Sequence, residues 1–258
     1  MGHGTKVSGA NKLVTAGFTK VSGVNKKITK GLTRVSGAQK VINFVTVEPV
    51  ALSTFAEGDI VYIPENGVDT PFYVAKHNYE SGLNGSGRTL LVRRYLYSKT
   101  MAINSSGVNV YASGETDTWL NADYKSLLPN TVQTLIGTTK FYYTPGNGNK
   151  TVTTLERSCF LLSYTEMKSH TSTTYNNIEG TTLPIASSLL VGLRENGSAA
   201  SQWTRSPRTN GTTGFCVFMT DGSGSAFTAS TATVVRPRPV FTLPSTTGFN
   251  PETNEIVA

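Results

Sequence analysis

The sequence predicts an α+β protein in which an extended, repeat-containing N-terminal arm precedes a mixed domain of antiparallel strands and two short helices. Three observations predict this fold class. A five-residue unit recurs every 14 residues within the first 44 residues. Beyond them, short apolar runs are separated by clusters of Gly, Asn, Ser and Pro, which is typical of antiparallel strands joined by turns. In residues 113–128 the apolar residues recur instead at helical spacing.

The arm is built from three copies of one unit. Thr-Lys-Val-Ser-Gly at residues 5–9 returns at residues 19–23 and, with Arg in place of Lys, at residues 33–37. Each run from Thr to Val alternates polar and apolar residues, and Ser-Gly is suited to a turn. We therefore expect short extended pieces that become ordered when the arm docks. Such a repeat suits a partner that is itself repetitive or is contacted at several points.

The arm carries the positive charge of the chain. Residues 1–44 contain no acidic residue and eight basic ones, which are Lys6, Lys12, Lys20, Lys26, Lys27, Lys30, Arg34 and Lys40. The whole chain has 23 basic and 16 acidic residues, so residues 45–258 keep 15 basic and 16 acidic residues and a charge of −1. The eight basic residues are the candidate docking residues, because they steer the arm toward an acidic surface.

That acidic surface could belong to a protein or to a nucleic acid. Basic residues that neutralise phosphates favour nucleic-acid binding through counterion release. Phe18 and Phe44 are the only aromatic residues of the arm, too few for bases to stack between. We therefore favour a protein-docking arm, and keep nucleic-acid binding and a merely solvated tail as alternatives.

Composition argues against several classes of function. No apolar run is long enough to cross a membrane, and the first residues lack the apolar core of an export signal, so we expect no membrane insertion. Cys159 and Cys216 lie in apolar runs without CxxC spacing, which favours buried thiols over a disulfide. The three histidines are scattered, so we expect no metal site and no cofactor.

The domain is expected at residues 58–243, between a linker at residues 45–57 and a C-terminal tail at residues 244–258. Its first strands are expected to form an antiparallel meander with one face buried and the other exposed to solvent. The strands of this meander are expected at residues 59–63, 71–76 and 89–96. A loop at residues 81–87 is expected to join the second strand to the third.

Two short helices are expected inside the domain. The first spans residues 113–128, where Ser113 or Thr116 can cap it and Pro129 ends it. The second opens at Ser163-Tyr164-Thr165-Glu166, which has the spacing of a capping box.

The second half of the domain contains more strands and a long polar loop. The strands are expected at residues 140–143, 151–162 and 214–219. Residues 169–201 are polar and punctuated, which is typical of a functional loop or insertion. The closing run at residues 233–241 contains Pro237 and Pro239, so we expect an edge or terminal strand there and not a central one.

Residues 58–243 contain five short motifs in a fixed order, which are Gly58-Asp59, Trp119-Leu120-Asn121, Phe160-Leu161-Leu162-Ser163, Trp203-Thr204-Arg205-Ser206-Pro207 and Val235-Arg236-Pro237. With these motifs in this order, the chain resembles a domain family of uncharacterised function that is abundant in clostridial genomes and their phages. The family looks similar to the C-type-lectin-like fold of phage tropism determinants and sulfatase-modifying enzymes. This resemblance implies a ligand surface formed by late loops. Arg238-Pro239 departs from the family, which usually has an aliphatic residue after a single Pro.

The repeated arm resembles N-terminal segments of phage virion proteins from Gram-positive hosts. Together the two resemblances imply a bacteriophage structural protein in the virion, whose arm binds capsid or tail proteins and whose head faces host-surface carbohydrate or protein. A capsid decoration or head fibre and a tail-associated receptor-binding protein both remain open. We expect a homo-oligomer or many copies, because weak lectin-like heads gain from avidity. A stand-alone nucleic-acid-binding protein that uses the arm is the alternative.

The late part of the domain supplies the candidate ligand-binding residues, which are Trp203, Arg205, Arg208, Asn210, Arg194, Asn196 and Asp221. A Trp–Arg pair could stack on a sugar and donate hydrogen bonds to its hydroxyls. For Trp203 and Arg205 we favour the alternative, in which the Trp packs in the core and the Arg bonds backbone carbonyls. Trp119 is likewise expected in the core.

The sequence offers little for catalysis or calcium binding. It contains no Gly-x-Ser-x-Gly elbow, no His-Glu-x-x-His and no phosphate-cradling loop. Nothing fixes the separation of Glu156 and Glu166 as a carboxylate pair. Cys159 and Cys216 do not match the cysteines of the sulfatase-modifying relatives, and the Glu-Pro-Asn and Gln-Pro-Asp runs of calcium-dependent lectins do not occur. We therefore expect a binding protein and not an enzyme.

Overall fold

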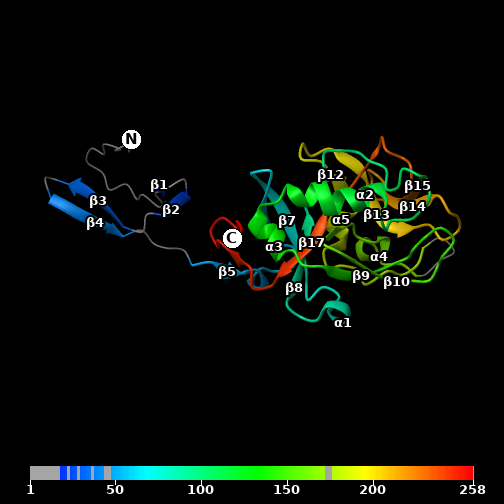
Figure 1. Cartoon of the computed structure of the whole chain (residues 1–258), viewed down its shortest axis with the longest axis horizontal. Helices are drawn as coiled ribbons and strands as arrows, with labels where there is room; N and C mark the ends of the chain where they lie inside the picture. The colour runs from blue at the N-terminus through cyan, green and yellow to red at the C-terminus, as the bar shows by residue number, and fades with distance from the viewer. Residues whose placement is uncertain are drawn as a thin grey trace. The chain divides into compact units, whose positions relative to one another are not determined.

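The computed structural model describes residues 48–171 and 176–257, together with the backbone of four strands between residues 18 and 43. The chain divides into two compact units, Met1–Glu48 and Pro49–Ala258, and each is described by itself (Figure 1). The first unit contains the arm and the second contains the domain.

In the arm, the sequence repeat corresponds to β-hairpins. The strands are β1 (Phe18–Val21), β2 (Val24–Lys27), β3 (Lys30–Val35) and β4 (Ala38–Asn43). β1 pairs antiparallel with β2, and β3 with β4. Thr19 pairs with Lys26 in the first hairpin, and Thr33 pairs with Lys40 in the second, so the same register returns 14 residues later. The extended pieces expected from the alternating pattern are therefore the strands of these hairpins.

The centre of the domain is a five-stranded sheet with the order β11-β17-β8-β7-β6, in which every neighbouring pair is antiparallel. Its strands are β6 (Ile60–Glu65), β7 (Val68–His77), β8 (Arg88–Arg93), β11 (Cys159–Phe160) and β17 (Val240–Pro244). In β8 the consecutive residues Leu90, Leu91 and Val92 are all fully buried. Since neighbouring residues of a strand point to opposite faces, both faces of the sheet are covered here.

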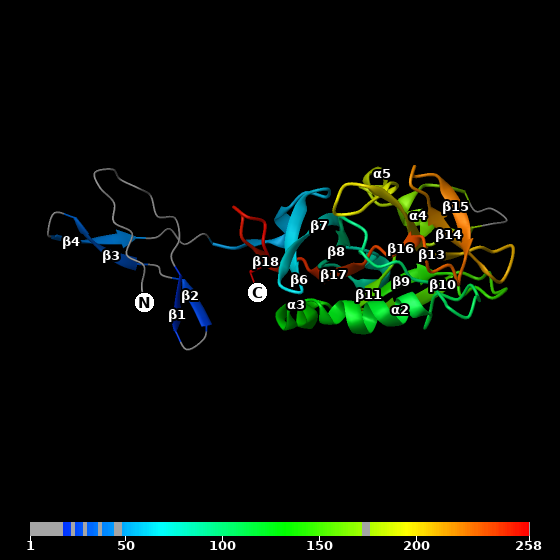
Figure 2. The same ribbon diagram turned by 90° about the horizontal axis from the view of Figure 1, so that it is seen from above.

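A second sheet and a separate hairpin complete the strands in the later part of the domain. The sheet consists of β12 (Gly192–Leu193), β13 (Ala199–Pro207), β14 (Gly214–Phe218) and β15 (Gly224–Thr228), with β16 (Val235–Arg236) parallel to β13. The hairpin consists of β9 (Thr139–Tyr143) and β10 (Thr153–Arg157). Both views show β14 and β15 at the opposite end of the domain from β7 (Figures 1 and 2).

Short helices lie along two sides of the sheets (Figure 2). On one side are α2 (Glu115–Trp119), the π-helical turn η2 (Leu120–Tyr124) and α3 (Asn130–Leu135); on the other are α4 (Tyr164–Met167) and α5 (Ala186–Leu189). Further short helices are α1 (Ser81–Asn84) and η1 (Leu52–Thr54). None of the helices in the described part of the chain has the length and apolarity needed to span a bilayer.

The described elements confirm the mixed α+β class with mostly antiparallel strands. The capping box is also confirmed. The Ser163 hydroxyl accepts from the Glu166 N–H at 3.1 Å, and the Ser163 N–H donates to the Glu166 carboxylate at 2.7 Å. The predicted loops at residues 81–87 and 169–201 contain secondary structure, namely α1 in the first, and α5, β12 and the start of β13 in the second.

One prediction about the start of a helix was wrong, and one about the closing strand was wrong in part. Neither Ser113 nor Thr116 caps the first helix, because Gly114 occupies the N-cap and the Ser113 N–H instead donates to the Asp117 carboxylate at 2.8 Å. The closing run at residues 233–241 divides between two strands: among the described strands β16 pairs with β13 alone, as expected of an edge strand, whereas β17 lies between β11 and β8 and is central. Pro237 and Pro239 fall before β17 begins, so they remove none of its hydrogen bonds.

The described parts of the predicted linker and C-terminal tail, from residue 49 to 57 and from 244 to 257, belong to the folded domain. β5 (Val50–Ala51) pairs antiparallel with β18 (Gly248–Phe249), and both Leu52 and Phe249 are fully buried. Beyond β18, the Ile256 N–H donates to the Tyr62 carbonyl at 3.1 Å. The first and last segments of the domain therefore pair with each other, and the last segment also bonds to strand β6.

The division after Glu48 predicts that the domain folds without the arm. We expect residues 49–258 to unfold at the same urea concentration as the full chain, measured by circular dichroism. Removal of residues 1–57 is the matched control, since it also deletes β5 and the buried Leu52. That shorter fragment should lose about 1.5–3 kcal/mol, the value of one buried Leu. Equal midpoints for the two fragments would contradict this account.

Candidate functional site

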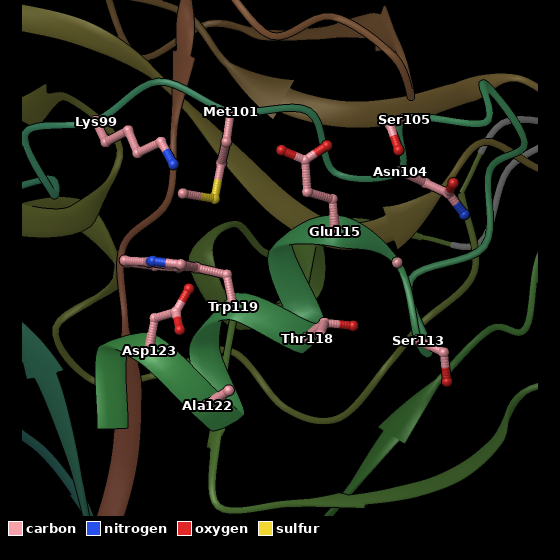
Figure 3. Close-up of a pocket in the computed structure, with 11 residues that line it drawn as sticks. Lys99, Met101, Asn104, Ser105, Ser113, Glu115, Thr118, Trp119, Ala122 and Asp123 are labelled. Carbon is pink, nitrogen blue, oxygen red and sulfur yellow. The ribbon is translucent and has the colours of Figure 1, made fainter. Parts of the chain in front are cut away.

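The candidate site is a cavity of about 540 Å³ between helix α2 and the segment that precedes it (Figure 3). Its lining residues are Lys99, Met101, Asn104, Ser105, Ser113, Gly114, Glu115, Thr118, Trp119, Ala122 and Asp123. Lys99 and Met101 come from the segment that passes over the helix, whereas Glu115 and Trp119 come from α2, and Asp123 comes from the turn η2 that continues it (Figure 3).

A half-buried tryptophan forms the apolar part of the cavity. The Trp119 ring packs against Tyr97, with ring centroids 4.8 Å apart, and against Tyr124 at 5.5 Å. These contacts fix the orientation of the ring while part of it remains exposed. A fixed, partly exposed aromatic ring can bind the apolar face of a ligand without first losing conformational entropy.

Charged and polar groups surround the tryptophan. Glu115 and Asp123 supply two exposed carboxylates, and Lys99 supplies an ammonium group. Among the residues that the structure describes, none pairs with these three side chains or with the Thr118 hydroxyl. The cavity therefore offers hydrogen-bond acceptors and donors that are free to bind a polar ligand.

Buried hydrogen bonds hold the overlying segment in place. The Trp203 Nε1–H donates to the Met101 carbonyl at 2.8 Å, and the Thr116 hydroxyl donates to the Ala102 carbonyl at 2.7 Å. Trp203 is 1% exposed and Thr116 is fully buried. Together they fix the wall of the cavity from behind.

The start of helix α2 requires a glycine. A Cβ atom on Gly114 would lie 2.5 Å from the Ile103 carbonyl oxygen and 3.0 Å from the Tyr111 carbonyl oxygen, both of which are backbone atoms. Any larger residue would therefore push the helix away from the segment that forms the other wall.

Trp203 and Arg205 of the sequence motif lie in the core and not at a surface. Both are almost completely buried. Arg205 donates to the Glu166 carboxylate at 2.6 Å, to the Leu161 carbonyl at 2.7 Å and to the Tyr142 carbonyl at 2.9 Å. Burial lowers and the Glu166 carboxylate raises the pKa of Arg205, and the net result is a rise. Trp203 therefore packs in the core and Arg205 bonds backbone carbonyls, as the favoured interpretation of the sequence predicted.

The other candidate residues are not brought together. Arg208 lines a separate cavity of about 160 Å³ beside Tyr164 and Cys216. Asn210 lies exposed before β14, and Asp221 lies in an exposed turn, where its carboxylate accepts from the Ser223 N–H at 2.8 Å. The candidate ligand surface predicted from these residues is therefore split over several places.

Arg194 and Asn196 do line a common cavity, of about 240 Å³. Leu96, Ser98, Glu195 and Arg236 complete its wall. Of the residues predicted to bind a ligand, these are the two that share one cavity.

The docking residues of the arm, the metal ligands and the cysteines are the remaining points on which the sequence made predictions. Lys6 and Lys12 lie outside the described residues, and so do the side chains of the six other docking candidates, namely Lys20, Lys26, Lys27, Lys30, Arg34 and Lys40. Within the described residues, no group of three or more His, Cys, Asp or Glu is placed to hold a metal ion. Cys159 and Cys216 are buried free thiols, and burial raises the pKa of both to about 12.

Sequence reasoning placed Trp119 in the core, and the half-buried ring does pack against the core, but its second role as a lining residue of the cavity was not predicted. One signal could have found it. Glu115, Thr118, Ala122 and Asp123 are polar or small, and they share the face of the helix on which Trp119 lies. A tryptophan in such surroundings is more exposed than the apolar spacing alone suggests.

Comparison with known proteins gives one match. A family described as "Domain of unknown function (DUF6273)" matches residues 86–245, which is more than half of the chain. This range contains the candidate cavity and most of the motifs noted in the sequence. Searches of curated proteins and of solved structures found no match.

The buried position of Arg205 predicts a large effect on stability. Arg205→Met should lower the free energy of unfolding by about 3–5 kcal/mol, because Glu166 would be left as an unpaired buried charge. The control is Lys140→Met, which breaks the exposed pair with Glu156 and should cost less than about 1 kcal/mol. Urea unfolding measures both, and similar losses in the two variants would refute the structural role of Arg205.

Proposed function

Because the chain belongs to the family described as a domain of unknown function (DUF6273), its function has to be inferred from its own residues, and we propose that it is a bacteriophage structural protein of the virion surface. In this proposal the basic arm binds capsid or tail proteins. The domain is an adhesive head with a C-type-lectin-like fold that binds host-surface carbohydrate.

The uneven distribution of charge between the two units is the observation that carries the proposal. Residues 1–44 hold eight basic residues and no acidic one, whereas residues 45–258 have a charge of −1. The compact units divide close to the same point, after Glu48. A basic segment outside a near-neutral domain is suited to grip the acidic surface of a large assembly, which leaves the domain for a different partner.

The repeat supports an arm that makes the same contact more than once. Two described hairpins have the same register, 14 residues apart. A virion is a repetitive assembly, so its surface offers equivalent sites to equivalent hairpins. Several weak contacts of this kind add up to firm attachment through effective concentration.

The cavity beside Trp119 supports an adhesive head. The faces of a sugar ring are apolar and its rim carries hydroxyl groups. Trp119 offers a flat apolar surface, and Glu115, Asp123 and Lys99 offer hydrogen-bonding groups around it. A binding head needs no catalytic residues, and the proposal assigns none.

A second candidate function rests on the arm alone. Its charge of +8 also favours a stand-alone protein that binds nucleic acid. A gel-shift experiment with the full chain and with residues 49–258 separates the candidates. Nucleic-acid binding by the full chain that weakens steeply with salt would favour this second function over the virion.

The proposal predicts that removal of residues 1–48 prevents incorporation into phage particles. Purified particles from a host that expresses this deletion should lack the protein, while particles with the full chain contain it. A quantitative gel of the particles also separates two placements, because a capsid decoration is present in many copies and a tail-associated protein in few. Normal incorporation without the arm would end the proposal.

The cavity predicts which variants lose glycan binding. Trp119→Ala should weaken binding to a glycan array about tenfold or more, since an aromatic contact contributes about 1.5–3 kcal/mol. Glu115→Gln and Asp123→Asn should also weaken it, because neutral side chains accept weaker hydrogen bonds. Glu252→Gln, at an exposed position outside the cavity, is the charge-matched control. Unchanged binding in the carboxylate variants would place the ligand elsewhere.

A further inference from the structure

Two arginines face a second cavity beside the one that contains Trp119. Arg194 and Arg236 both line this cavity of about 240 Å³. Arg194 lies in the turn between β12 and β13, and Arg236 lies in β16. Both side chains are partly exposed, and like charges at one small cavity favour the binding of an anion that can accept hydrogen bonds from both.

The local interactions leave this charge uncompensated. The Arg194 Nε–H donates to the Ser198 hydroxyl at 2.7 Å, and an Arg236 Nη1–H donates to the Tyr97 carbonyl at 3.4 Å. Neither partner carries a negative charge. Burial, and then the charge of Arg194, lower the pKa of Arg236.

The acidic residue of this cavity is already paired. The Glu195 carboxylate accepts from Arg93 at 2.7 Å. Arg93 also binds Glu65 at 3.0 Å. Together, Arg93, Glu65 and Glu195 therefore have a net charge of −1. Arg194 and Arg236 more than offset this charge, which leaves the cavity with a net positive charge.

A further arginine, two residues after Arg236 in the chain, is buried. Arg238 is 3% exposed, and its Nε and Nη1 have no hydrogen-bond partner among the described residues. Burial lowers its pKa to about 10, so the group still carries its charge at neutral pH. No carboxylate forms a salt bridge with it in the part of the chain that the structure describes.

The two cavities share one segment of chain. Leu96 and Ser98 line the smaller cavity, and Lys99 lines the larger one. Between them, the Tyr97 ring packs against Trp119 and the Tyr97 carbonyl accepts from Arg236. A ligand that lies over this segment therefore meets the tryptophan on one side and the arginines on the other.

We propose that Arg194 and Arg236 form a subsite for an oxyanion, so that the ligand of the head is a glycan that carries phosphate or carboxylate groups. The guanidinium groups donate charge-assisted hydrogen bonds to the oxyanion, and the sugar ring next to it packs on Trp119. This inference rests on the proposed adhesive function, which it narrows to acidic glycans.

The test uses the full chain and small probes of known charge. Inorganic phosphate, D-glucuronate and neutral D-glucose are titrated separately, and the Nε–H resonances of Arg194 and Arg236 are followed by NMR. Because each resonance reports on one residue, binding of anions to the basic arm does not interfere. We expect phosphate or glucuronate to shift both resonances. The anion that binds with the higher affinity identifies the kind of oxyanion that the subsite prefers. Glucose should shift neither.

Variants test whether the pair acts together. Because the variants lack one or both arginine resonances, their anion binding is followed at the backbone N–H resonances of Ser198 and Tyr97, which adjoin the two arginines. Arg194→Gln combined with Arg236→Gln should weaken anion binding at least about tenfold, while Arg194→Lys should have a smaller effect because it keeps the charge and loses the forked donors. The exposed residues in Lys150→Gln combined with Lys168→Gln give the same change in net charge and should leave binding within about twofold. Thermal unfolding confirms that each variant is folded.

Two results overturn the inference. One is the absence of any shift of the Arg194 and Arg236 resonances with phosphate and with glucuronate. The other is an equal loss of anion binding in the lysine control. Neither outcome touches the adhesive function, since neutral glycans could still bind at Trp119. Conversely, anion binding at the two arginines without binding to any glycan of an array would end the adhesive function and leave the subsite standing.

Discussion

The domain depends on one buried ion pair, between Arg205 and Glu166. Arg205 lies in β13, and through its guanidinium group it binds the carboxylate of helix α4 and the carbonyls of Leu161 and Tyr142. These partners come from segments far apart in the sequence. One side chain thus holds the second sheet, a helix and the hairpin of β9 and β10 together. A neutral residue could satisfy only some of these partners.

The same strand supports the candidate site without touching a ligand. Two residues before Arg205, Trp203 donates to the Met101 carbonyl and so fixes one wall of the cavity beside Trp119. The motif that is most conspicuous in the sequence is therefore architectural, and its effect on binding is indirect. A change at Trp203 would alter the shape of the cavity without replacing any of its lining residues.

Local signals in the sequence predicted local structure well and tertiary placement poorly. The spacing of Ser163 and Glu166 predicted a capping box, and alternation predicted the strands of the arm, because both depend on neighbours in the chain. The central position of β17 depends instead on pairing with β8, about 150 residues away in the sequence. None of the residues that line the cavity beside Trp119 was predicted to bind a ligand. In the smaller cavity, Arg194 and Asn196 were predicted, whereas Arg236 was not, because only the fold brings β16 beside the turn after β12.

The pairing of β5 with β18 determines how the domain responds to mechanical load. If the protein is held by its N-terminal end while its ligand is held elsewhere, tension enters the domain at Val50. Only two residues of β5 pair with β18, so this short ladder and the Leu52 side chain resist the pull first. The five-stranded sheet and the cavity beside Trp119 are formed by residues that follow β5 in the sequence. Under tension β5 would therefore peel away before the grip on the ligand is disturbed.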